Sequence, residues 1–315
     1  FLGRKYGGLA LVTVVACMFF AAISGSGPAT VAAIGGLTIP SMLKQGYDRP
    51  FAGAISAAAG SIGVIIPPSI PMVMFCVATG VSVGAMFMGG VIPGLLIGVS
   101  LCLYSSLYSK KHKYINAEAA PFSWGNVGRS LADGIWALLV PVIILGGIYG
   151  GIFTPTEAAA VAVAYGLIVG LFVYRDLKAK DLYRIFGSAA LTTATIMVIL
   201  GTATTFGRIL TLERIPTMIA DFFESVAKGP IMLMILINIL LLIVGCFMET
   251  NAAIIILAPI FLPIVESMGI NPVHFGIVMV VNLAIGFVTP PLGVNLFVAC
   301  NVANAATKTN NSLKF

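Results

Sequence analysis

The feature that most constrains this chain is a set of long apolar stretches interrupted by helix-breaking residues. Residues 7–43 carry no charged side chain, yet the segment "SGSGP" (24–28) lies in the middle of them. Hydrophobic residues make up 59% of the chain and charged residues 9%, whereas a soluble domain has roughly 25% charged residues. A β-barrel would show short alternating segments instead. The composition therefore predicts an all-α polytopic membrane protein.

The formal net charge of +6 does not indicate a nucleic-acid partner. The basic residues are scattered over short loops, where positive charge in a membrane protein reports orientation. Membrane lipid is the expected surrounding. The cysteines lie in apolar segments without CxxC spacing, so neither a disulfide nor a metal role is expected for them; they are Cys17, Cys76, Cys102, Cys246 and Cys300.

Uninterrupted apolar stretches of the length that a bilayer needs predict plain transmembrane helices. They cover 89–109, 131–150, 155–174 and 188–209. Short amphipathic pieces between them are expected to lie in the membrane interface; these are 80–88, 122–130, 178–187 and 213–226. In "TPTEAAA", Glu157 fits the first turn of a helix whose N-cap is Thr154 or Thr156.

The two interrupted regions of the chain match each other. A shift of 223 positions aligns Pro and Gly residues without a gap, and these residues dictate backbone shape; the pairs include Pro40 with Pro263, Gly46 with Gly269, Gly53 with Gly276, Gly63 with Gly286, and Pro67-Pro68 with Pro290-Pro291. Each copy is predicted to hold a re-entrant helical hairpin (7–43 and 229–268) and a helix broken at its Pro-Pro pair. The predicted units are 1–79, 228–305, the connecting helices 80–227 and a polar tail 306–315.

Counting crossings makes the two repeats inverted, as in many secondary transporters. The second hairpin then opens from the side opposite to the first. Most Lys and Arg residues fall on one side, and the other side holds Arg208, Arg214 and Lys228. The positive-inside rule makes the richer side cytoplasmic. The stretch 28–43 is short for a full crossing, which favours a hairpin over two spans.

Helix breaks at membrane depth are expected to lie inside the protein or beside a cavity, because unpaired backbone groups are tolerated only there. The hairpin tips "SGSGP" and "METNA" (248–252) are each expected to face a Pro-Pro break, in 60–71 and 284–293. Proline removes amide donors and frees carbonyls upstream. Two oxygen cages for a small hard cation are predicted, one formed by Ser24, Ser26, Gly60, Gly63 and Ile65, the other by Thr250, Asn251, Gly286, Val288 and Thr289.

Helix N-termini at the same level would present N–H groups to an anion. A substrate site is therefore predicted at Ser26, Gly27 and Thr250. Arg208 could clamp a substrate carboxylate in a bidentate pair, although such an arginine more often reaches toward lipid headgroups. Glu249, an acid at a hairpin tip, is either a proton or ion site or the cap of the following helix.

No nucleophile–base arrangement, Walker loop or metal-ligand cluster occurs in the sequence. The chain is therefore not expected to be an enzyme, and energy for transport would come from an ion gradient or another subunit. Oxygen cages without an obligatory acid favour sodium as the coupling ion, with no other cofactor. A non-transporting membrane anchor is an alternative, but it would not need paired, inverted helix breaks.

Several long motifs resemble one known family. "ISGSGPATVAAIGG", "GSIGVIIPPSIPMV", "FTPTEAAAVAVAYGL" and "GFVTPPLGVNLFVA" are similar to the large membrane subunit (DctM type) of tripartite ATP-independent periplasmic (TRAP) transporters. The resemblance implies sodium-coupled import of a small carboxylate, such as a sialic acid or a C4-dicarboxylate, across the bacterial inner membrane by an elevator movement. It also implies two partners, a small four-helix membrane subunit and a periplasmic substrate-binding protein.

Two further expectations come with this resemblance. The family has additional helices before and after the matched region, so the chain is expected to be a piece of a longer protein. A citrate- or divalent-anion-type symporter, which shares hairpins and inverted repeats but needs no binding protein, stays open as an alternative. The strings "GVIIPPS" and "TPTEAAA" favour the TRAP family.

Overall fold

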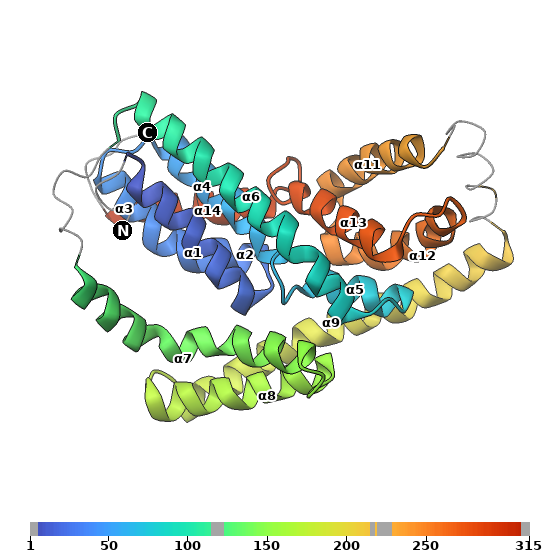
Figure 1. Cartoon of the computed structure of the whole chain (residues 1–315), viewed down its shortest axis with the longest axis horizontal. Helices are drawn as coiled ribbons and strands as arrows, with labels where there is room; N and C mark the ends of the chain where they lie inside the picture. Colours follow the sequence, from blue (N-terminus) through green and yellow to red (C-terminus); the bar gives the residue numbers. More distant parts are fainter. Residues whose placement is uncertain (1–5, 115–122, 215–217, 219–228, 310–315) are drawn as a thin grey trace.

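The computed structural model describes residues 6–114, 123–214, 218 and 229–309, and all regular elements in that part of the chain are helices (Figure 1). The prediction of an all-α protein is confirmed. The elements, in chain order, are α1 (Gly8–Ser24), α2 (Gly27–Thr30), η1 (Val31–Gly35), α3 (Gly36–Lys44), α4 (Arg49–Ser61), η2 (Ile62–Val64), α5 (Ile70–Thr79), α6 (Val83–Lys111), α7 (Trp124–Tyr149), α8 (Pro155–Ile168), η3 (Val169–Val173), α9 (Ala179–Leu212), α11 (Pro230–Phe247), α12 (Thr250–Ser267), α13 (Pro272–Gly286) and α14 (Val294–Thr309).

Six helical segments of the described chain are long and apolar enough to cross a membrane: α6, α7, α8 with η3, α9, α11 and α12. The first four contain the predicted plain spans. The helices α11 and α12 have 18 residues each, so length does not separate a re-entrant hairpin from a pair of crossings in the second repeat. The re-entrant geometry therefore stays a prediction.

Three of the predicted interfacial pieces are continuous with the long helices that follow them. Most of 80–88 forms the first turns of α6, most of 122–130 the start of α7, and most of 178–187 the start of α9. The piece at 213–226 lies almost wholly outside the described residues. The α8 terminus agrees with its sequence signature, since Thr154 is the N-cap and forms a reciprocal capping box with Glu157.

Each predicted helix break is present between two helices. The first hairpin turns at Gly25 and Ser26, and the second turns at Met248 and Glu249. The helix begun by α4 is interrupted between η2 and α5, and that begun by α13 is interrupted before α14. Both interruptions contain a cis Pro-Pro bond, at 67–68 and at 290–291.

The buried apolar residues form two main cores, and the two broken helices are shared between them. The first core packs α1, η1, α3 and α4 of the predicted first repeat against α14 of the predicted second repeat. The second core packs α11, α12 and α13 against α5 of the predicted first repeat and the start of α6. Each broken helix thus contributes one half to its own hairpin and its other half to the opposite one (Figure 1).

The helix α6 runs along both cores (Figure 1). It approaches its neighbours closely at glycines. A Cβ added at Gly90 would lie 2.8 Å from the Ile65 carbonyl oxygen, and one at Gly94 would lie 2.5 Å from Ile66 Cγ1. A Cβ at Gly98 would lie 2.4 Å from Met18 Sδ. Small residues spaced by four let two backbones pack at short range in a membrane, so α6 is fitted against the first Pro-Pro break.

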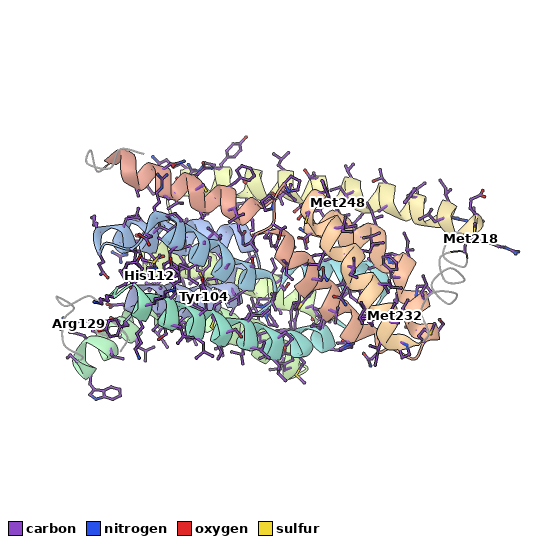
Figure 2. The ribbon with its side chains drawn as sticks, turned by 90° about the horizontal axis from the view of Figure 1, so that it is seen from above. Tyr104, His112, Arg129, Met218, Met232 and Met248 are labelled. Carbon is purple, nitrogen blue, oxygen red and sulfur yellow. The ribbon has the colours of Figure 1, made fainter. Side chains whose placement is uncertain are left out.

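Aromatic rings join the C-terminal end of α6 to the turn between α3 and α4. The Phe51 and Tyr108 rings stack with centroids 4.3 Å apart, and those of Tyr47 and Tyr114 with centroids 4.5 Å apart. Burial raises the pKa of Tyr47 in that turn. Tyr104 and His112 lie at this end of the molecule, whereas Met248, at the second hairpin tip, lies nearer its middle (Figure 2). The cluster fixes the first core to α6 at the end remote from the helix breaks.

Candidate functional site

The tip of the first hairpin is a tight turn that only glycine fits. Gly25 is buried and has φ of 60°, in the left-handed region. A Cβ there would lie 2.8 Å from the Pro68 carbonyl oxygen. The Gly25 carbonyl accepts a hydrogen bond of 3.3 Å from the Ile70 amide. The turn and the first Pro-Pro break are therefore held against each other through backbone atoms.

Neutral oxygens gather immediately after this turn. The Thr30 hydroxyl donates to the Ser26 carbonyl over 2.7 Å and lies 3.0 Å from the Ser24 hydroxyl. A Cβ added at Gly63 would lie 2.5 Å from Thr30 Oγ1 and 2.7 Å from the Ser26 carbonyl oxygen. Gly60 lies one turn earlier on the same broken helix. We call Ser24, Ser26, Thr30 and the backbone at Gly60 and Gly63 the first oxygen cluster.

Close backbone packing holds the first oxygen cluster together. A Cβ on Gly27 would lie 3.3 Å from the Gly60 carbonyl oxygen, and one on Gly60 would lie 3.3 Å from that of Gly27. The same Cβ on Gly60 would lie 2.1 Å from Val31 Cγ2. Val31 begins η1, a short π-helical segment, and π-bulges are frequent at functional sites.

Ile65, which the sequence predicts as a ligand of the first cation, has different surroundings from the first oxygen cluster. The Ile65 carbonyl faces Gly90 of α6. Ser69, which the sequence reasoning did not select, is buried, and its hydroxyl donates to the Val64 carbonyl and accepts from the Met72 amide. A cavity of about 240 Å³ opens beside the tip. Its lining includes Ser24, Gly25, Pro68, Ser69 and Ile70.

The second tip is organised by Glu249, which is exposed and acts as the N-cap of α12. One carboxylate oxygen accepts from the Ala252 amide over 3.0 Å, and the other accepts from Asn251 Nδ2 over 2.9 Å. These bonds satisfy the capping role that was one of its two predicted readings. Thr250 is buried, and Asn251 Oδ1 is buried without a hydrogen-bond partner.

The second Pro-Pro break also packs on its hairpin through glycine. A Cβ added at Gly286 would lie 2.1 Å from the Gly245 carbonyl oxygen. The Leu292 amide donates to the Cys246 carbonyl over 3.0 Å, at a neighbouring position to that of the Ile70 bond in the first tip. Each tip is thus tied to its own break.

Backbone turns satisfy part of the second break. The Thr289 hydroxyl donates to the Ile285 carbonyl over 2.8 Å, and the Thr289 amide donates to the Gly286 carbonyl over 3.2 Å. The Val288 amide donates to the Ile285 carbonyl over 3.0 Å. The Thr289 hydroxyl oxygen keeps lone pairs that could face a cation. The cation role of Val288 and Thr289 stays a prediction.

The predicted cation ligands at both tips are neutral carbonyl, hydroxyl and amide oxygens, and Glu249 adds a carboxylate beside the second set. Among the residues that the structure describes, no three His, Cys, Asp or Glu side chains lie close enough to hold a metal ion together. Carbonyl and hydroxyl oxygens suit a hard cation and give a transition metal no soft donor. Of the predicted site residues, Glu249 and Arg208 alone have ionisable side chains.

Arg208 is not gathered with the other predicted residues. It is exposed near the C-terminal end of α9, and that end lies beyond α12, away from the helix breaks (Figure 1). Its substrate role stays a prediction, as does an anion cavity between Ser26 and Thr250.

The sequence reasoning missed five residues that the structure brings to these tips: Thr30, Ser61, Ser69, Gly245 and Asn295. Thr30 had a local signal, because it lies one helical turn after Ser26. Asn295 is fully buried, and its side-chain amide reaches α4, 238 positions earlier in the chain. The only sign of Asn295 in the sequence is that it is a polar residue among apolar neighbours just after the second Pro-Pro pair.

Comparison with known proteins decides the family. The tripartite ATP-independent periplasmic transporter, DctM component, matches residues 1–313. The chain belongs to the DctM family. The hairpin tips and helix breaks described above therefore belong to a TRAP transporter large permease component. Such a component is a multi-pass protein of the bacterial inner membrane and not an enzyme.

Curated relatives are similar along nearly the whole chain. It is 56% identical over 304 residues to the isethionate TRAP transporter permease protein DctMQ of Oleidesulfovibrio alaskensis, covering 96% of this chain and 48% of that protein. It is 47% identical to the C4-dicarboxylate TRAP transporter large permease protein DctM of Pseudomonas aeruginosa and 40% identical to the sialic acid protein SiaM of Vibrio cholerae. Those matches cover 96% of this chain and 70% of each relative. The chain thus spans about half of the first relative and a larger share of the others.

Proposed function

We propose that this chain is the ion- and substrate-binding part of a sodium-coupled importer of a small organic anion. The observation that carries the proposal is the first oxygen cluster, where uncharged oxygens from a hairpin tip meet a helix opened by Pro-Pro. Such a cluster offers a hard cation carbonyl and hydroxyl ligands without a fixed negative charge. The second tip, with Thr250, Asn251 and Gly286, is proposed as a second cation site.

Carboxylates are the substrate class that the resemblance to TRAP transporters implies. Relatives named for C4-dicarboxylates, sialic acid and 2,3-diketo-L-gulonate favour that class, and the relative named for isethionate adds a sulfonate. The common property is a small organic anion. We place its site beside the first tip, where the cavity lined by Ser24 and Ser69 opens.

In the proposed cycle, sodium binds first and orders the tips, and the anion then binds beside them. The paired cores would move together as the elevator. Sodium entering down its potential contributes about 2.3 kcal/mol per net charge per 100 mV. A small membrane subunit and a periplasmic binding protein that delivers the substrate are the proposed partners, by analogy with the family.

A melting experiment tests the ion part without any partner. The full-length protein in detergent is heated in sodium, potassium and choline chloride at equal ionic strength. A ligand that binds only the folded state stabilises it by RT ln(1 + [L]/Kd), about 2.7 kcal/mol at a hundredfold excess. Equal melting temperatures in the three salts would contradict sodium coupling. Uptake by proteoliposomes that contain both partners, driven by a sodium gradient, then tests candidate anions.

A further inference from the structure

Asn295 occupies a position that joins the two helix breaks. Its backbone amide donates to the Phe287 carbonyl over 3.0 Å, across the second Pro-Pro break. Its side-chain nitrogen donates to the Ala57 carbonyl over 3.1 Å and to the Ser61 hydroxyl over 3.2 Å. Ala57 and Ser61 flank Gly60 on α4, so one residue of the second repeat is bonded to the helix that carries the first oxygen cluster.

The orientation of the Asn295 amide follows from its partners. The Ala57 carbonyl can only accept, so the nitrogen of the side chain must face it. The oxygen Oδ1 is then left buried without a hydrogen-bond partner. A Cβ added at Gly27 would lie 3.3 Å from both Oδ1 and Nδ2 of Asn295. The unsatisfied oxygen therefore lies against the first hairpin arm, at the residue that follows Ser26.

Only one of the two related positions carries this polar connection. The position related to Asn295 by the shift of 223 is Met72, a buried apolar residue of the second core. Met72 can offer no strong hydrogen bond to the second tip. A displacement of the first tip or of α4 therefore changes polar contacts of the second break, through Asn295.

We propose that Asn295 is a positioning residue that couples the two cation sites, an inference that rests on the proposed sodium sites. Ordering of the first tip by a cation fixes Gly27 and Gly60, which fixes the Asn295 side chain and with it the backbone at Phe287. The second break then needs less ordering before its own cation binds. A ligand that binds an already ordered protein has a smaller entropy cost, which is positive cooperativity.

The test measures equilibrium sodium binding to the full-length protein at constant temperature, by calorimetric titration with total ionic strength held by choline chloride. The variant is Asn295→Ala. The matched control is Asn282→Ala, because Asn282 is also a buried asparagine with an unpartnered Oδ1 and donates across helices to Asn238 over 2.7 Å. Both variants lose comparable hydrogen bonds, so a general loss of stability affects them alike.

Coupling predicts a sigmoidal sodium titration for the unmodified protein, with a Hill coefficient near the number of coupled sites, about 2. Asn295→Ala is expected to lower it to about 1 and to raise the sodium midpoint by about tenfold, within the range of known coupling. Asn282→Ala is expected to keep both values. If Asn295→Ala does not fold, Ser61→Ala, which removes one acceptor of the amide, is expected to lower the Hill coefficient part of the way.

The outcomes separate this inference from the proposed function. Sodium binding with an unchanged Hill coefficient and midpoint in Asn295→Ala and Ser61→Ala would overturn the coupling and leave the sodium sites in place. A wild-type titration with a Hill coefficient of about 1 would do the same. No sodium binding to the unmodified protein would overturn the proposed function, and the coupling with it.

Discussion

Substituting Gly63 by alanine tests the first oxygen cluster most directly. The new Cβ would lie 2.5 Å from Thr30 Oγ1 and 2.7 Å from the Ser26 carbonyl oxygen, closer than real Cβ atoms come to any neighbour. The Thr30 hydroxyl could rotate away, but the Ser26 carbonyl belongs to the backbone of the tip. The methyl group therefore displaces the oxygens that are proposed to hold the cation.

The magnitude can be bounded with a control on the same broken helix. Forcing one extra methyl into a packed site costs about 1–3 kcal/mol. At Gly53, in α4, a Cβ would meet nothing within 4 Å, and alanine in a helix interior is favoured over glycine by roughly 0.5–1 kcal/mol. The two alanine variants should therefore differ in stability by about 1.5–4 kcal/mol, with Gly63→Ala the less stable.

The assay is thermal unfolding of the full-length protein in detergent, in sodium and in choline chloride. Gly53→Ala is expected to melt at or above the wild-type temperature and to keep the sodium-dependent rise. Gly63→Ala is expected to melt lower and to lose that rise. A Gly63→Ala variant with a wild-type sodium response would refute the cluster as a cation site, even if its melting temperature fell.

Substitutions at three further residues test other parts of the two tips. Gly286→Ala would place a Cβ 2.1 Å from the Gly245 carbonyl oxygen, so it should lower the melting temperature and abolish sodium-driven uptake; uptake at the wild-type rate would contradict the tight packing of the second break. Glu249→Gln keeps an acceptor for the Ala252 amide, so uptake and its pH profile should be unchanged if the carboxylate only caps α12. Glu249→Ala removes the cap and should lose about 1 kcal/mol of stability. A shifted pH profile of uptake in Glu249→Gln would argue for a proton site. Thr30→Val keeps the side-chain shape but removes the hydroxyl that bridges the first tip, so the sodium-dependent rise in melting temperature should disappear with a stability loss of only about 1 kcal/mol; a retained rise would remove Thr30 from the site.

The positions of the helix breaks were predictable because they depend on the backbone properties of the residues at the breaks themselves. Gly25 can adopt a positive φ at no steric cost, and Pro67 and Pro68 lack the amide donors that continue a helix, whatever surrounds them. The capping box of Thr154 and Glu157 was predictable for the same reason, since both partners lie within one turn.

The contacts between distant elements were not predictable in this way. Asn295 contributes to the first tip only because α14 packs on α4, and nothing local to either helix specifies that pairing. The Ile65 carbonyl faces α6 because Gly90 leaves room there. The sequence predicts separate interfacial pieces where α6, α7 and α9 begin. Polar residues in a helix signal the water boundary but do not end the helix, so the structure has continuous helices there.

The sharing of the broken helices between the two cores has a consequence for how the protein is made. When α4 leaves the ribosome, the helix that completes its core, α14, has not been synthesised, because the Asn295 contact to Ala57 spans 238 positions. Until then the buried faces of α1 and α4 are exposed to lipid or to other proteins of the membrane. A chain that stopped before residue 294 would leave the first core open while the second, already holding α5 and α11 to α13, could close. Early termination should therefore yield a half-assembled protein that membrane quality control can recognise by its first tip.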